Sequence, residues 1–153
     1  MRIALLTNHE RCVAVAGVLL GLCVSAALAP KNSFFFPNMA YFWGSQLAVL
    51  ALTLPLKPRP AIIAGVSVAL AVYLGAFGAW LFSRTHPESM AWLGYLCSLP
   101  GAALGALIAT FSLRSRTAMN TLVIGLVAMS AVLLGAFLNQ AVVCSTVMYC
   151  GGK

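Results

Sequence analysis

Cysteine is the most reactive side chain type in this sequence, and its five cysteines fall into two groups. Cys144 and Cys150 lie close to the C-terminal end. Six helical residues rise about 9 Å, which exceeds the roughly 7 Å limit between the α-carbons of a disulfide. A Cys144–Cys150 disulfide therefore requires the last helix to end before Cys150, and both the bonded and the free form stay open. The remaining three are expected to act as small apolar residues: Cys12, Cys23 and Cys97.

Acid–base, metal or haem chemistry inside a membrane would need ionisable groups within the apolar segments, and we expect none there. The two carboxylate side chains, Glu10 and Glu88, and the two histidines, His9 and His86, lie outside those segments. Neither a phosphate-binding glycine loop nor a nucleophile elbow occurs. A quinone-linked thiol oxidoreductase would need a Cys-x-x-Cys pair or two outer pairs, and the sequence has neither. We therefore expect no enzyme, no cofactor and no metal site.

Aromatic residues gather towards one expected face, which is the outer one. Two interpretations stay open: an aromatic belt at the lipid interface, or a platform that contacts lipid tails or a helix of another protein. Three consecutive phenylalanines in the segment 32–38 would be unfavourable in water, so they must be buried in lipid, in the bundle or in a partner. Its expected residues are Phe34, Phe35, Phe36, Tyr41, Trp43, Trp80, Trp92 and Tyr95.

Amide side chains within the apolar segments form a second candidate site. Gln46, Asn139 and Gln140 all fall in the expected outer half. Hydrogen bonds between helices, each worth about 0.6 kcal/mol, would account for them. The alternative is that they line a polar pocket or the mouth of a pore.

Composition defines the solvent in which these residues must be placed. The chain is 62% hydrophobic and 7% charged, with a mean hydropathy of +1.00. A soluble surface needs roughly a quarter of its residues charged, so we expect an integral membrane protein with residues 1–153 as a single domain. Uncharged apolar segments long enough to span a bilayer predict an all-α transmembrane bundle. They cover residues 12–29, 39–56, 61–82, 91–113 and 118–140.

Positive charge predicts the orientation of the bundle. A cytoplasmic N-terminus places six basic residues inside and three outside, which favours N-in and C-out across five spans. The inner residues are Arg2, Arg11, Lys57, Arg59, Arg114 and Arg116, and the outer ones are Lys31, Arg84 and Lys153. This spacing, without a basic stripe, disfavours nucleic-acid binding despite the formal charge of +7. We expect the first span to be retained, because proline would follow the signal-peptidase-like site that ends at Ala29.

Small residues recur at helical spacing and predict close helix contacts within the bundle rather than dimerisation. Examples are Gly17 with Gly21, Gly101 with Gly105, and Ala131 with Gly135. Pro100 falls inside the fourth span and predicts a kink there.

These observations favour a non-enzymatic, multi-pass protein of the bacterial inner membrane that acts by helix packing. Its partners would be the lipid bilayer and either another membrane protein or further copies of itself. It would serve as an accessory subunit, or as an immunity or regulatory protein. The alternative is a small oligomeric channel or transporter for a neutral solute or ion, lined by the three amide residues.

Overall fold

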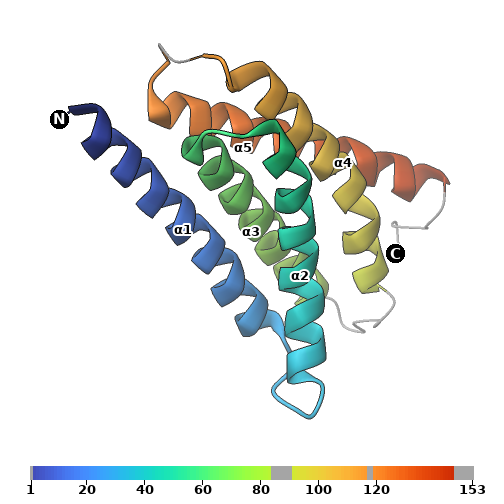
Figure 1. The fold of residues 1–153 in the computed structure, drawn as a ribbon. Helices are drawn as coiled ribbons and strands as arrows, with labels where there is room; N and C mark the ends of the chain where they lie inside the picture. The colour runs from blue at the N-terminus through green and yellow to red at the C-terminus, as the bar shows by residue number, and fades with distance from the viewer. Residues whose placement is uncertain (1, 84–90, 117–118, 147–153) are drawn as a thin grey trace.

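A computed structural model of the protein describes residues 2–83, 91–116 and 119–146. The described part is a bundle of five α-helices with one short 3₁₀ helix, and each α-helix is long and apolar enough to cross a membrane (Figure 1). The predicted fold class, an all-α bundle with five candidate spans, is confirmed. The elements are α1 (Arg2–Leu28), α2 (Phe35–Thr53), η1 (Leu54–Leu56), α3 (Pro60–Phe82), α4 (Ala91–Leu113) and α5 (Thr121–Thr146).

Three helix boundaries differ from the predicted ones by more than three residues. Helix α1 begins at Arg2, so that Glu10 and Arg11 belong to the helix rather than to a segment before it. Helix α2 begins at Phe35, inside the expected loop. Helix α5 continues to Thr146, past the predicted end at residue 140. At about 1.5 Å per residue, α1 and α5 each exceed the hydrocarbon thickness of a bilayer, so we expect them to be tilted.

Helix α3 forms the centre of the bundle. It packs against all four other α-helices, whereas the other helices each leave a broad apolar face uncovered. Ile62, Val66, Ala69, Leu70 and Leu74 are each at most 1% exposed. A helix that is apolar on every side suits this central position.

A sharp turn connects α2 to α3. Pro55 lies within η1, and Lys57 then adopts a left-handed backbone with φ of 50° while its N–H bonds to the carbonyl of Leu54 at 2.9 Å. Pro60 occupies the first turn of α3, where its fixed φ suits a helix start and its missing N–H costs no hydrogen bond. The turn brings Arg59 to the end of the bundle where α5 begins.

Small residues bring the helix backbones into direct contact within the bundle. Gly101 of α4 faces Gly135 of α5, and Gly65 of α3 faces Gly125 of α5, so closely that a Cβ at Gly101 or Gly65 would collide with the opposite backbone. The predicted role of these residues in internal packing is thus met at the α4–α5 contact. Helix α4 continues through Pro100.

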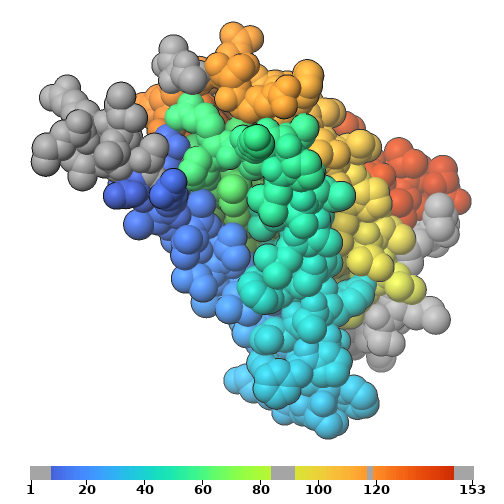
Figure 2. All heavy atoms as spheres, viewed as in Figure 1, coloured from blue at the N-terminus to red at the C-terminus, as the bar shows by residue number. Residues whose placement is uncertain are grey.

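The hairpin of α1 and α2 projects at one end of the bundle. Its turn lies at the bottom of the view, beyond the visible ends of the neighbouring helices (Figures 1 and 2). Phe34 in this turn is 64% exposed, and Phe36 in the first turn of α2 is 73% exposed. The tip of the molecule at this end is therefore aromatic.

Candidate functional site

The expected aromatic platform divides into an internal cluster and an exposed tip. Tyr95 is fully buried, so its assignment to an outer contact surface is wrong. It was misplaced because sequence position gives depth along the helix but not which side of the helix faces the core. Its ring stacks on Tyr73 at 6.0 Å, and its hydroxyl lies 3.5 Å from the Ser45 hydroxyl.

Trp92 is partly buried and also belongs to this cluster. Its ring centroid lies 4.4 Å from that of Phe42 and 5.7 Å from that of Phe77, and its carbonyl accepts a 3.5 Å hydrogen bond from Tyr41. Aromatic pairs at such distances stabilise a fold by about 0.5–1.5 kcal/mol each. These rings therefore join α2, α3 and α4 towards the end that bears the hairpin tip.

The remaining platform residues differ in exposure. Trp80 is 43% exposed, with its ring 5.4 Å from that of Phe77, and Trp43 and Phe35 are partly buried. Phe34 and Phe36 are the most exposed of the set. Among the described residues of the platform, only those at the tip have large aromatic side chains that are mostly exposed.

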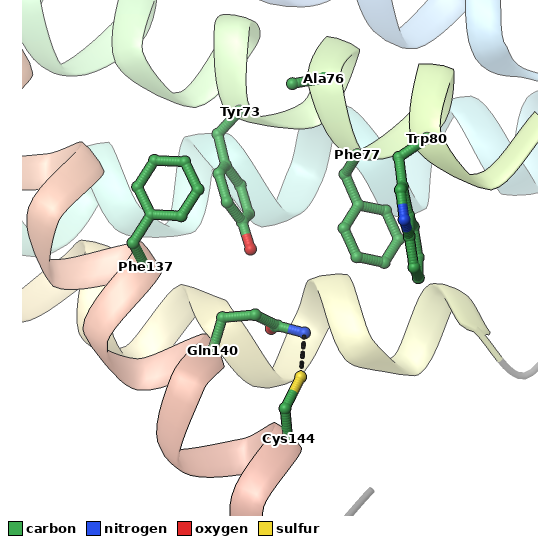
Figure 3. Close-up of a pocket in the computed structure, with 7 residues that line it drawn as sticks. All are labelled: Tyr73, Ala76, Phe77, Trp80, Phe137, Gln140 and Cys144. Atoms are coloured by element: carbon green, nitrogen blue, oxygen red, sulfur yellow. Dashed lines mark hydrogen bonds between the residues drawn. The ribbon is translucent and has the colours of Figure 1, made fainter. Parts of the chain in front are cut away.

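A cavity of about 260 Å³ opens between α3 and α5 beside the aromatic cluster (Figure 3). Aromatic rings supply most of its wall, and one amide and one sulfur atom supply polar edges. Figure 3 shows Tyr73, Phe77 and Trp80 reaching from α3 towards the side chains of α5. The lining residues are Tyr73, Ala76, Phe77, Trp80, Phe137, Gln140 and Cys144.

The three amide residues do not line a common cavity. Gln46 is 3% exposed and packs against Gly21 of α1. Asn139 donates a hydrogen bond from Nδ2 to the carbonyl of Cys97 across the α4–α5 contact. Gln140 lies at the aromatic cavity instead. The positions of the three amide residues in this chain therefore favour bonding and packing between helices over the lining of a single pore.

Cys144 is disulfide-bonded, and the Nε2 atom of Gln140 lies 3.5 Å from its sulfur. Cys150 lies outside the described residues, so a Cys144–Cys150 bond stays a prediction. The described part of helix α5 reaches Thr146, so the condition that the helix stop before Cys150 also stays a prediction. Cys12, Cys23 and Cys97 carry free thiols.

A buried ion pair at the opposite end of the bundle was missed by the sequence reasoning. Glu10 is 6% exposed, and its Oε1 atom accepts hydrogen bonds from Arg59 Nη2 at 2.9 Å and from the Thr121 hydroxyl. Arg59 Nη1 also donates to the carbonyl of Arg116 at 3.1 Å. Three segments therefore meet at the Glu10 carboxylate, namely α1, the α2–α3 turn and the start of α5, and Arg59 connects them to the α4–α5 turn.

The sequence did contain a signal for this ion pair. Ala14, Gly17, Gly21 and Ser25 form the buried face of α1, and Glu10 continues that face by one helical turn. A carboxylate on a buried face needs a partner, because an unpaired buried charge is strongly destabilising.

Two further grooves lie along the bundle. One, of about 480 Å³, runs between α1 and α5 over α3 and has Glu10 and Thr121 at its polar end. The other, of about 450 Å³, follows the small residues of the α4–α5 contact. Both are lined mainly by apolar side chains, as expected for surfaces that face lipid.

The described residues thus define a class: an all-helical protein with five candidate membrane spans, an aromatic cavity, an aromatic tip and one buried ion pair. No family model, curated protein or solved structure matches the chain.

Proposed function

We propose that this protein is a non-enzymatic, multi-pass protein of the bacterial inner membrane that acts by packing against another membrane protein. It would be an accessory subunit of a larger complex, or an immunity or regulatory protein. The proposed orientation is N-in and C-out. The observation that carries the proposal is the projecting α1–α2 hairpin with Phe34 and Phe36 exposed at its tip.

A phenylalanine side chain that is exposed at the tip of a hairpin is unfavourable if the tip is in contact with water. Burying such a side chain gains about 1.5–3 kcal/mol, and the bundle itself leaves both side chains mostly uncovered. Lys31, Asn32 and Asn38 flank the aromatic residues, so the tip combines an apolar centre with a polar rim. This arrangement resembles the core and rim of a protein interface.

The test is the double substitution Phe34→Ser and Phe36→Ser in the protein extracted from its native membrane with a mild detergent. We expect native mass spectrometry to show a stoichiometric second protein with the wild-type chain and its loss with the variant. Phe111→Ser is the matched control, since Phe111 is 63% exposed on α4 near the opposite end of the bundle. The control should retain the partner.

Two results would contradict the proposal. If the double variant retains every partner, the tip does not bind the partner, and its phenylalanines belong to an aromatic belt at the lipid interface. Wild-type chain found solely at multiples of 16.0 kDa would favour self-assembly, and flux measurements on reconstituted protein would then test the channel alternative.

A further inference from the structure

The aromatic cavity between α3 and α5 contains two buried polar atoms that lack a partner. Among the described residues, no partner lies at hydrogen-bonding distance and angle from the Tyr73 hydroxyl or from the Gln140 Oε1 atom, and neither atom is exposed to solvent. Tyr73 as a whole is 5% exposed, and its side chain lines the cavity. A buried polar group without a partner destabilises a protein by about 1–3 kcal/mol, so each such group calls for an explanation.

The surroundings limit what can satisfy these atoms. Tyr73 lies in the middle of α3, at a depth where a bilayer offers no water. The Nε2 atom of Gln140 is directed to the sulfur of Cys144, which leaves Oε1 to accept a hydrogen bond. Figure 3 shows the Tyr73 hydroxyl pointing from α3 towards the Gln140 side chain. A hydroxyl donor and an amide acceptor therefore face the same space.

The walls of the cavity define the rest of a ligand. Phe77, Trp80 and Phe137 present rings, which favour a flat apolar body. Phe137 is 60% exposed and Trp80 is 43% exposed, so the cavity opens sideways to lipid rather than to water. A cavity of about 150 Å³ accommodates benzene. The volume of about 260 Å³ here has room for a bicyclic ring.

We propose that this cavity binds a small, neutral, planar aromatic molecule that bears a hydroxyl group and reaches the site from the bilayer. The ligand hydroxyl accepts a hydrogen bond from Tyr73 and donates one to Oε1 of Gln140. A molecule that can only accept, such as a quinone, would satisfy Tyr73 and leave Gln140 unsatisfied. A plain hydrocarbon ring would satisfy neither atom. This inference is independent of the proposed partner, because the hairpin tip contributes no residue to the cavity.

The test uses radiolabelled 2-naphthol as the probe and naphthalene as its apolar control. Full-length protein in phosphatidylglycerol nanodiscs is titrated by equilibrium dialysis, and binding to empty nanodiscs is subtracted. We expect saturable binding of 2-naphthol to the wild-type chain, with naphthalene weaker by about tenfold because it forms no hydrogen bond.

Three variants locate the site. Tyr73→Phe and Gln140→Leu should each weaken 2-naphthol binding by about fivefold to tenfold, and Tyr73→Phe should leave naphthalene binding unchanged. Tyr41→Phe is the matched control, because Tyr41 donates to the Trp92 carbonyl and lines none of the cavity. It should bind both probes as the wild type does.

Several outcomes would overturn the proposal. One is the absence of saturable binding to the wild-type chain, which would mean that Tyr73 and Gln140 satisfy one another. Equal affinity for naphthalene and 2-naphthol would show that the polar atoms take no part. An equal loss of binding in Tyr41→Phe and Tyr73→Phe would place the probe elsewhere. The comparison of the two probes on the wild-type chain holds even if a variant fails to fold.

Discussion

At the residue scale, the side chain of Glu10 connects several separate segments of the chain. Its carboxylate accepts hydrogen bonds from Arg59 and Thr121, while Arg59 also holds the carbonyl of Arg116. Each of these partners belongs to a different turn or helix start. Such a junction fixes the relative positions of helix ends that share few other polar contacts at this end of the bundle.

We therefore expect Glu10→Gln to destabilise the protein by about 1–3 kcal/mol. The substitution leaves the Arg59 guanidinium, which is 23% exposed, without its counter-charge. The free energy of unfolding in mixed detergent micelles, followed by circular dichroism, is the measurement. Arg59→Gln alone should cost a similar amount, and the double variant should cost less than the sum of the two. Strict additivity would show that the ion pair contributes no coupling energy.

The sequence predicted the positions and partners of individual polar residues only in part. The sequence allowed Gln46 and Asn139 either to form bonds between helices or to line a polar pocket, and the structure places each against a neighbouring helix. Glu10 was assigned to a segment before the first span, because hydropathy decreases at the first charged residue whereas the helix does not end there. Its partner Arg59 is distant in sequence, so no local pattern identifies it.

At the scale of elements, glycine determines how closely α5 approaches its neighbours. The Gly101–Gly135 contact joins α4 to α5, and the Gly65–Gly125 contact joins α3 to α5. In a membrane the hydrophobic effect does not drive helices together, so close contact must supply the attraction through dispersion. These contacts also position α5 against α3, with which it forms the walls of the aromatic cavity.

We expect Gly101→Leu to separate α4 from α5 and to destabilise the bundle by about 1–3 kcal/mol or more. A Cβ at this position would collide with the backbone of Gly135 and with Asn139. Gly44→Leu is the matched control, since no atom of the described residues lies within 4 Å of a Cβ added to Gly44. Unfolding free energies of the two variants, measured side by side, test this. A similar cost for both would assign the effect to helix propensity or lipid contact.

The sequence predicted the number and type of the helices because each span must be apolar to enter a bilayer. It predicted their ends less accurately. Phe35 and Phe36 begin α2 rather than belonging to a loop, and α5 runs past residue 140. Hydropathy measures the apolar length, whereas a helix extends as far as its backbone hydrogen bonds continue. The aromatic cavity was not predictable, because Tyr73 and Gln140 meet only once α3 and α5 are packed.

At the scale of the whole molecule, most of the chain lies in helices that can enter a membrane, and the connections between them are short. The two ends of the bundle differ in chemistry. One carries the Glu10–Arg59 ion pair together with Arg114 and Arg116, and the other carries the aromatic cluster and the hairpin tip. This difference supports the proposed orientation, since basic turns favour the cytoplasm.

Topology reporters test that orientation directly. Alkaline phosphatase folds only where its disulfides form, so we expect high activity when it is fused to the C-terminus and low activity when it follows Arg116. A fluorescent protein that folds only in the cytoplasm should give the reverse pattern at the same two positions. Fusions at both positions use the same chain, so expression measured by immunoblot serves as the internal control. Inverted activities would mean that the tip with Phe34 and Phe36 faces the cytoplasm. Any partner of the tip would then have to be sought on that side of the membrane.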